Sequence, residues 1–569
     1  MSADSGSPAD GGPGERASVL GSSAVMAAGT VVSRLSGFVR TTLLAAALGT
    51  QLHADVFNIA NTIPNMLYIL LAGGIFNAVL VPQLIRAMKN DADGGEGYTN
   101  RIITLAALFL AGVTAVLVVA APLVMRLFLD GSFYEPGLAA QRESVIDFAR
   151  YCLPQVFFYG MFVLVGQVLN ARGSFGPMMW APIANNVIAV AVLVAYLLTL
   201  GAAEGSERCA GYDPGGELLL GLGSTVGIAV QLLVLLPYLR KAGFRFRPRF
   251  DFRGTGLGHT LRLGIWTVLF VVVNQIAYTV VVRLASSGTA AAATGACASG
   301  AQDAGTGYTV YSTAFLLIMV PHSIATVSLA TAILPRLSAF AADGRLADLG
   351  RGVAETLRTT YAVIIPFAAL LPVVALDVSN VLFKYGAASA TYSDYVLPLS
   401  LFAIGLVFFT AHYLVLRGFY ALEMTRAAFW VQTVIAGANI VLAVLLTRGI
   451  EPAQTAPRLV LAYSGAYAVG AVVSYTVLRR VVGGLQTPRL ARFAVRMVVA
   501  VGISTAVAAG VSWLLREVWT GDSASKLEAV VALLLVGAVD LVCYLALARL
   551  LRLREVTDVV GQLTRRLAR

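Results

Sequence analysis

Two arginines stand inside the first apolar stretch of the chain, where a charge is costly. The segment GTVVSRLSGFVRTTLLAAALG carries Arg34 and Arg40, and a charge at the centre of a membrane helix costs about 2.5–3.5 kcal/mol on insertion scales. In a helix the two lie about 9 Å apart along the axis and about 120° around it. Both guanidinium groups can therefore border one wide cavity, where they suit a pyrophosphate or a carboxylate.

A second interpretation of these charges needs no ligand. Arg34 can pair with a carboxylate inside the protein, and Arg40 can extend to the membrane surface. Asp55, early in the second apolar segment, is the nearest acidic candidate, and asparagines follow it at helical spacing, where they would be costly facing lipid. We predict a substrate-binding set made of Arg34, Arg40, Asp55, Asn58, Asn61 and Asn65.

Small residues and proline in the same two segments predict hinges or close packing. Gly37 lies between the arginines and leaves room for a ligand or a neighbouring helix. Pro64 and the Gly73-Gly74 pair favour a kink in the second segment, although a plain packing role is an equal alternative.

The residue types that usually carry catalysis are scattered. The four histidines (His53, His259, His322 and His412) have no ligand-like spacing, so we expect no metal site. The sequence contains no GxxxxGK[ST], GxSxG or HExxH pattern. We therefore expect a protein that is not an enzyme and has no cofactor.

Two of the four cysteines fall in predicted outward loops. Cys209 lies in loop 201–216 and Cys297 in loop 285–307, whose Gly/Ala/Ser composition is typical of lids or linkers. A Cys209–Cys297 disulfide is a candidate there, since that side of a membrane can be oxidising.

The elements that must position these residues are membrane-spanning helices. The 569 residues are 58% hydrophobic and 12% charged, with a mean hydropathy of +0.79, whereas soluble domains are roughly a quarter charged. Continuous apolar runs of the length of a membrane helix recur along the chain. They lie at about 20–48, 56–87, 102–129, 145–169, 178–200, 217–239, 261–284, 308–338, 353–378, 394–419, 427–447, 459–478, 493–515 and 527–548. The predicted fold is all-α and polytopic, with about fourteen transmembrane helices.

The net charge of +11 is carried mostly by arginines between the predicted helices. They concentrate in the connections after even-numbered helices and in the C-terminal tail, which predicts that both termini are cytoplasmic. No polar domain concentrates the charge as a nucleic-acid binder would. The loop 240–260 alternates Arg and Phe, which favours contact with anionic membrane lipids.

An internal repeat divides the chain. Pro82 aligns with Pro335 and Asn186 with Asn439, both at an offset of 253 positions. Transporters are often built from such repeats, with the substrate site between them. The predicted units are a disordered tail at 1–18, six-helix bundles at 19–240 and 261–480 joined by a basic loop at 241–260, two extra helices at 481–555 and a basic tail at 556–569.

The motifs SRLSGFVRTTLLAAALG, ADVFNIANTIPN, LNARGSFGPMMWAPIANN and ILPRLS resemble those of the MurJ/MviN lipid II flippases of the MOP transporter superfamily. The resemblance implies that lipid II, an undecaprenyl-pyrophosphate-linked glycopeptide, is moved from the inner to the outer leaflet of the bacterial plasma membrane for peptidoglycan synthesis. It implies that Arg34 and Arg40 hold the pyrophosphate, with Asp55 matching the family's acid, and that the last two helices form a groove for the lipid tail. A membrane potential or ion gradient is the implied driving force.

The sequence departs from that family at several positions. Tyr68 and Ile69 stand where better-known members have arginines, Gly73 replaces an acid, and the apolar LLIMVP at 316–321 lacks another arginine. Asn274 and Asn439 are the nearest polar groups to the acids of the family's sodium site, which argues against sodium coupling.

Other functions remain open from the sequence. One is a flippase for another polyprenyl-linked glycan or a cation-coupled exporter of the same superfamily, although exporters of cationic drugs usually need acids where this chain has arginines. Another is a membrane scaffold that recruits cell-wall synthases without transport. In the scaffold, loop 240–260 and the tail would be essential and the buried arginines expendable.

Overall fold

The chain folds into packed helices, in agreement with the predicted class. The computed structural model describes residues 13–70, 84, 86–88, 93–204, 207, 210–252, 257–299, 305–518 and 525–567, and these contain no strand. Twelve helical stretches among them are long and apolar enough to cross a membrane. Each matches one of the predicted segments from the third to the fourteenth. The first predicted segment is helix α1, and the described part of the second is helix α2.

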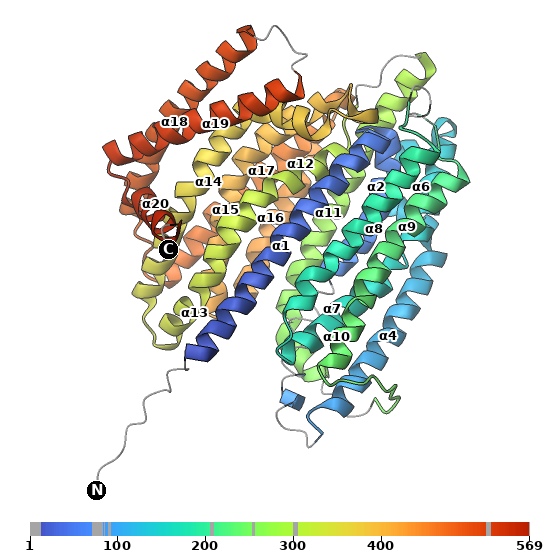
Figure 1. Ribbon diagram of the computed structural model, residues 1–569, viewed down its shortest axis with the longest axis horizontal. Helices are drawn as coiled ribbons and strands as arrows, with labels where there is room; N and C mark the ends of the chain where they lie inside the picture. The colour runs from blue at the N-terminus through green and yellow to red at the C-terminus, as the bar shows by residue number, and fades with distance from the viewer. Residues whose placement is uncertain are drawn as a thin grey trace.

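The first half of the chain supplies one lobe, drawn in blue and green in Figure 1. Its helices are α1 (Pro13–Leu48), α2 (Leu52–Ile69), α4 (Glu96–Val119), α5 (Ala121–Phe128), α6 (Ala139–Cys152), α7 (Gln155–Ala171), α8 (Gly176–Thr199), α9 (Pro214–Leu233) and α10 (Leu235–Lys241). Local sequence fixes several ends. For example, Asp213 caps α9 by accepting hydrogen bonds from the backbone N–H groups of Gly215 and Gly216, directly before Pro214 at the first helical position.

The second half supplies the other lobe and the C-terminal helices. The lobe contains α11 (Leu257–Ser299), α12 (Tyr308–Pro321), α13 (Ser328–Ala342), α14 (Leu346–Phe383), α15 (Val396–Ala421), α16 (Thr425–Leu446) and α17 (Thr455–Val481). A π-helical turn, His322–Val327, joins α12 to α13. Helices α18 (Thr487–Val518), α19 (Lys526–Leu550) and α20 (Arg554–Leu567) lie on the outer side of this lobe, against α14.

Helix packing repeats between the halves. Helix α1 packs on α8 as α11 packs on α16, and α8 packs on α9 as α16 packs on α17. Because α11 and α16 are the counterparts of α1 and α8 under the 253-residue offset, the duplicated sequence pattern corresponds to a duplicated packing pattern. The predicted pair of related bundles is confirmed by this architecture.

Three ends of elements differ from the sequence prediction. Helix α1 begins at Pro13, inside the segment 1–18 expected to be disordered. Helix α11 continues to Ser299, through residues expected to start a loop at 285. Helix α20 occupies most of the expected tail 556–569. Alanine explains the second difference, since the run Ala290–Ala293 consists of the residue with the highest helix propensity.

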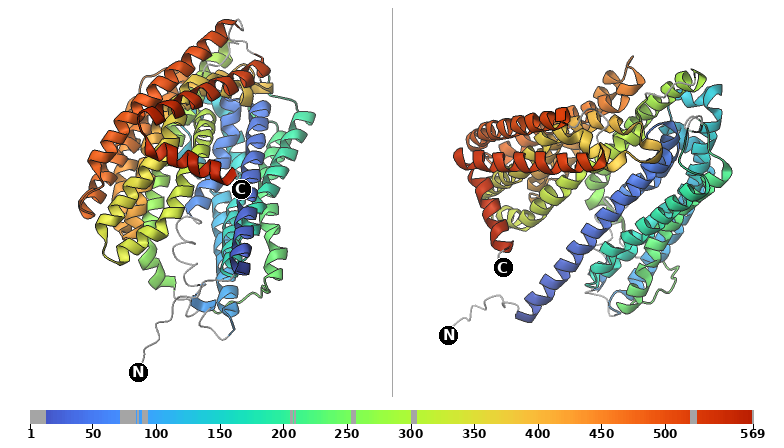
Figure 2. Two further views of the ribbon diagram at one scale, coloured as in Figure 1. Left: turned by 60° about the vertical axis from the view of Figure 1, so that its left-hand side comes forward. Right: turned by 45° about the horizontal axis from the view of Figure 1, so that its top comes forward.

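The two lobes approach each other at one end and diverge at the other. Figure 1 and the right view of Figure 2 both show α1 passing between the lobes, close to the second lobe at its C-terminal end. The diverging end carries α10 and the connection from α13 to α14. Arginines cluster in and next to the connections at this end, at Arg240, Arg245, Arg247, Arg249, Arg345 and Arg351.

Candidate functional site

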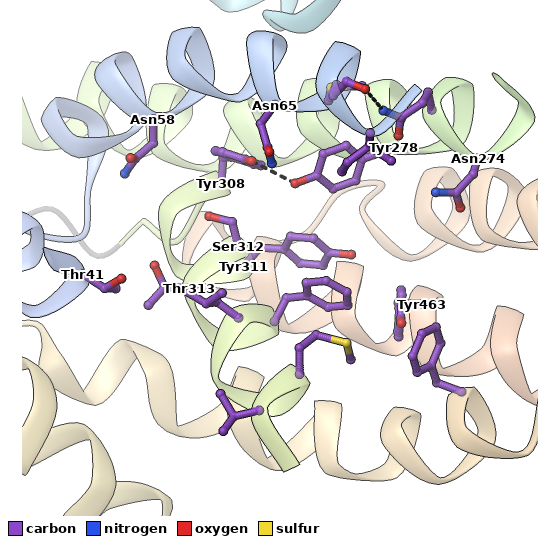
Figure 3. Close-up of a pocket in the computed structure, with 18 of the residues that line it drawn as sticks. Thr41, Asn58, Asn65, Asn274, Tyr278, Tyr308, Tyr311, Ser312, Thr313 and Tyr463 are labelled. Atoms are coloured by element: carbon purple, nitrogen blue, oxygen red, sulfur yellow. Dashed lines mark hydrogen bonds between the residues drawn. The ribbon is translucent and has the colours of Figure 1, made fainter. Parts of the chain in front are cut away.

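A cavity of about 730 Å³ lies between the lobes. Its walls come from α1, α2 and α8 of the first lobe and from α11, α12, α15, α16 and α17 of the second. Figure 3 shows part of the lining, with residues of α2, α11 and α12 around one space. The volume falls within the range of about 300–1,000 Å³ that is typical of ligand pockets.

Arg34 and Arg40 both line this cavity. Arg34 is exposed and Arg40 is half-buried. They are the only charged residues among the described residues that line it, and neither forms an ion pair within the described part of the chain. A cavity with two uncompensated cations provides a site for an anion that can accept hydrogen bonds from guanidinium groups.

Helix α8 holds the arginine-bearing part of α1. The side-chain amide of Asn186 donates hydrogen bonds to the backbone oxygen of Ser33 (3.0 Å) and to Oγ of Ser36 (2.9 Å). Gly37 faces the same amide, and an added Cβ there would lie 3.7 Å from Nδ2 of Asn186. Gly37 is thus a packing position on the cavity wall, where it lets α8 support α1 between the two arginines.

The three predicted asparagines of α2 have different surroundings. Asn58 lines the cavity and donates a hydrogen bond of 2.9 Å to Oγ1 of Thr309 on α12. Asn65 lines the cavity, is exposed, and has no hydrogen-bond partner in the described part of the chain. Asn61 does not belong to the lining, because its Oδ1 accepts a hydrogen bond of 2.9 Å from Gln155 on α7. The prediction that Asn61 faces the substrate is therefore corrected to a contact within the first lobe.

Asp55, predicted as part of the substrate-binding set, does not line the cavity, and it does not pair with the arginines, for which it was the nearest acidic candidate. Its carboxylate is fully buried and accepts hydrogen bonds from the backbone N–H groups of Tyr308 (3.0 Å) and Thr309 (2.6 Å) and from Oγ1 of Thr289 (2.8 Å). These donors lie at the start of α12 and on α11, so an acid of the first lobe caps a helix of the second. Free N–H groups and the dipole at a helix start favour a carboxylate, which explains why Asp55 lies there.

Further contacts join the lobes at the end where Asp55 lies. Oγ1 of Thr50 donates to Oγ1 of Thr391 at 2.8 Å. Nearby, Gly49 has a φ of +80° and packs against Ala387, while Gly386 has a φ of +48° and lies against the backbone of Ala46. Glycine adopts such positive φ values without strain, and it allows the two backbones to approach.

The remaining predicted hinge and disulfide positions are only partly described. Pro64 is buried inside α2, where it removes one hydrogen bond from the helix. Gly73 and Gly74 lie outside the described residues, as does Cys209, and the side chain of Cys297 is likewise outside them. The Cys209–Cys297 disulfide stays a prediction.

Most of the second-lobe lining was not in the predicted set. It includes Gln275, Tyr278, Tyr308, Tyr311, Gln432, Tyr463 and Tyr467. Asn274 and Asn439, noted in the sequence only as neutral replacements for acids, line the cavity as well. Polar side chains inside apolar segments are the signal that could have found them, since such groups seldom face lipid. Asn439 and its repeat counterpart Asn186 both reach the cavity.

The fold and the cavity together define a class of protein. Two related helical lobes around a cavity that contains two arginines form the architecture of a membrane transporter built from repeats. The family model described as lipid II flippase MurJ matches residues 44–531, and the chain belongs to this family.

A curated relative and two solved structures are similar to this chain, the structures in fold. The chain is 27% identical over 501 residues to "Probable lipid II flippase MurJ" of Rhizobium meliloti, covering 86% of each chain. The solved structure "Lipid II flippase MurJ, inward closed conformation" matches with a TM-score of 0.69 and 16% identity, over 92% of this chain and 98% of that one. An inward-facing multidrug resistance MATE transporter of the MOP superfamily matches with a TM-score of 0.61 and 15% identity, over 80% of this chain and 96% of that one.

Proposed function

We propose that this protein moves lipid II from the inner to the outer leaflet of the bacterial plasma membrane, with the pyrophosphate held by Arg34 and Arg40. The cavity carries two cations and no acid among the described residues that line it, so it favours an anionic group. A pyrophosphate matches two guanidinium forks, since each can donate two parallel hydrogen bonds to phosphate oxygens. The single observation that carries the proposal is this uncompensated pair of cations between the lobes.

Alternating access supplies the route. The lobes are joined at the end bearing Asp55 and Thr50 and diverge at the end rich in arginine. If the arginine-rich connections are cytoplasmic, as the positive-inside rule predicts, the cavity faces the inner leaflet in this state and both termini are cytoplasmic. Lipid II would enter from that leaflet, and export would require the contacts at the joined end to open.

The membrane potential is the driving force that best suits an anionic cargo. A potential that is negative inside favours outward movement of negative charge, by about 2.3 kcal/mol per elementary charge for each 100 mV. Asn274 and Asn439 provide no carboxylate for a sodium ion at the cavity wall. We therefore propose coupling to the potential rather than to sodium.

Anionic membrane lipids are the proposed partners of the basic segment that follows α10. Backbone N–H groups of Arg247 and Arg249 donate to side chains of α4, at Asn100 (2.8 Å) and Thr104 (3.1 Å), which fixes the segment on the lobe. Phe250 is 69% exposed beside these arginines. Exposed arginine and phenylalanine together suit the interface of an anionic leaflet.

Export in a reconstituted system tests the proposal. Purified protein in vesicles with fluorescent lipid II should increase the fraction of lipid II on the trans leaflet, and a potassium diffusion potential of the correct sign should accelerate the increase. Vesicles without protein are the control. No transfer of lipid II above that control would contradict the proposal, and transfer that only a sodium gradient accelerates would contradict the coupling.

The scaffold alternative predicts a different result in cells. Deleting residues 245–252 should leave export in vesicles intact if the segment only contacts lipid or partners. If the protein were a scaffold, this deletion would abolish its role in cells. The Arg34→Ala variant would then support growth as the wild type does.

A further inference from the structure

A second pocket, of about 360 Å³, lies where α14, α19 and α20 meet. These helices belong to the outer side of the second lobe in Figure 1, and the described linings of this pocket and of the cavity between the lobes share no residue. Two lining residues are exposed on the surface of membrane-spanning helices, Val363 at 41% and Leu541 at 55%. A ligand can therefore reach this pocket from the membrane without entering the cavity.

The described lining of the second pocket is apolar except for Asp540 and Tyr544 of α19. Packing explains Tyr544. Its hydroxyl donates a hydrogen bond of 2.8 Å to the backbone oxygen of Ala362 on α14. Pro366, one turn further along α14, has no N–H to offer that oxygen, so the tyrosine replaces the missing helical hydrogen bond.

Packing does not explain Asp540. The residue is 4% exposed, and its Oδ1 is buried without a hydrogen-bond partner in the described part of the chain. The hydroxyl groups of Ser504 and Thr505 on α18 lie near the carboxylate, but they carry no charge. Oδ2 is the oxygen left to meet a ligand in the pocket. A carboxylate inside a membrane-spanning helix is costly, and it usually has a partner that compensates its charge.

Two other acids of the same group of helices do have such partners. Asp377 of α14 lies 3.6 Å from Arg516 of α18. Glu555 of α20 lies 3.1 Å from Arg358 of α14. Asp540 has no ion-pair partner among the described residues, although it is the acid that lines a pocket. The compensating cation is therefore expected to come from a ligand.

We propose that the second pocket binds a long-chain primary amine, with the alkyl chain against α14 and α19 and the ammonium group on Asp540. An ammonium group supplies both a positive charge and hydrogen-bond donors to a carboxylate. The apolar lining suits the methylene chain. A hydrocarbon tail alone would fill the pocket without compensating the charge, and an alcohol would supply a donor without a charge. The inference goes beyond the proposed function, because it concerns a different pocket and a ligand of opposite charge.

Photolabelling tests the inference. The probe is dodecylamine with a diazirine in its chain, added to the full-length protein in phosphatidylcholine nanodiscs, and labelled peptides are identified by mass spectrometry. Asp540→Asn removes the charge at nearly constant size. Gly537→Phe fills the pocket, since an added Cβ at this lining glycine has no atom within 4 Å. The matched controls are Asp377→Asn and Gly510→Phe, an acid and an unobstructed glycine outside the pocket lining. Thermal unfolding verifies that each variant is folded.

Wild-type protein should be labelled in peptides of α14 and α19. Excess dodecylamine should displace the probe, whereas dodecanol and undecaprenyl pyrophosphate should not. Labelling should fall about tenfold in Asp540→Asn, because a charge-assisted hydrogen bond is lost. It should fall at least as far in Gly537→Phe, and both controls should be labelled as the wild type is.

Wild-type labelling of a folded Asp540→Asn variant would overturn the assignment of Asp540. Displacement by dodecanol as effective as displacement by dodecylamine would show that apolar fit alone fills the pocket, and displacement by undecaprenyl pyrophosphate would place a polyprenyl chain there instead. Either result would overturn the amine site. None of these outcomes bears on pyrophosphate binding at Arg34 and Arg40, so failure of this inference is distinguishable from failure of the proposed function.

Discussion

At the scale of single residues, the central feature is the pair of arginines without acidic partners. Arg34 and Arg40 line the cavity, and Asp55, the nearest acidic candidate to pair with them in the sequence, binds the start of α12 instead. A charge that the fold leaves uncompensated in the membrane region is kept at a cost, which indicates a role in binding. Removing it should therefore affect the ligand more than the fold.

Replacing Arg40 tests whether its charge or the planar geometry of its guanidinium group is needed to bind the pyrophosphate. Arg40→Lys keeps the charge but loses the planar fork, and Arg40→Ala loses both. If charge dominates, binding of undecaprenyl pyrophosphate in nanodiscs should fall about tenfold further for the alanine variant than for the lysine variant. Equal losses in both variants would show that bidentate geometry is required. Wild-type affinity in both would exclude Arg40 from the site.

The residue scale also shows how far the sequence predicts the site. Residue type alone predicted four residues of the cavity lining, because charged and amide side chains inside apolar helices are rare and costly. These residues are Arg34, Arg40, Asn58 and Asn65. The tyrosines that the second lobe contributes to the cavity were missed, because the spacing of a tyrosine along a helix does not reveal which face meets the cavity. Asn61 has the same helical spacing as its neighbours, and only the packing of α7 shows that it points elsewhere.

At the scale of elements, the contact between α2 and α12 links the lobes. Asp55 satisfies two backbone N–H groups at the start of α12 and the hydroxyl of Thr289. Gly307 precedes this helix, and a Cβ there would collide with Oδ2 of Asp55. The start of α12, Gly307 and Asp55 therefore pack together in a single contact between the two halves of the chain, with no room for a larger residue at position 307.

Breaking this contact should open the joined end. Asp55→Ala leaves two backbone N–H groups unsatisfied, at a cost of about 1–3 kcal/mol each while the contact is closed. In a variant lacking native cysteines, a cysteine at Asn65 should then react faster with a membrane-impermeant thiol reagent added from the extracytoplasmic side. Gly307→Ala should have the same effect.

The control for this experiment is Asp213→Ala, which removes a helix cap within the first lobe. It should lower thermal stability without changing the reactivity of the cysteine. Equal reactivity in the Asp55→Ala and Asp213→Ala variants would show that Asp55 does not hold the lobes together.

Helix positions were the most predictable part of the fold. All twelve spans of the described chain follow from apolar run length, because a membrane leaves few alternatives to a helix. The residues at which helices begin and end were less predictable from the sequence. The Ala-rich residues 290–293 of α11 resembled a linker by composition, although alanine favours helix once the preceding turns are formed.

At the scale of the whole molecule, transport requires the lobes to separate at the joined end. The hydroxyl oxygens of Thr50 and Thr391 lie 2.8 Å apart across the lobes, so cysteines at both positions should form a disulfide. In a variant whose native cysteines are replaced, oxidation of Thr50→Cys/Thr391→Cys should stop lipid II export in vesicles. Reduction should restore it.

Each single cysteine variant serves as the control for this crosslink and should export lipid II under both conditions. Export that continues in a fully crosslinked protein would show that the joined end need not open, and alternating access through it would be wrong.

The most direct test of the central claim compares ligands with and without the pyrophosphate. Binding of undecaprenyl pyrophosphate and of undecaprenol is measured for the wild type and Arg34→Ala/Arg40→Ala in nanodiscs, with thermal stability recorded for both proteins. The double variant should lose about 100-fold or more in affinity for the pyrophosphate, since hydrogen bonds to charged groups contribute about 1.5–3 kcal/mol each. Its stability and its affinity for undecaprenol should be unchanged. Retained pyrophosphate binding in a folded double variant would contradict the claim that these arginines hold the cargo.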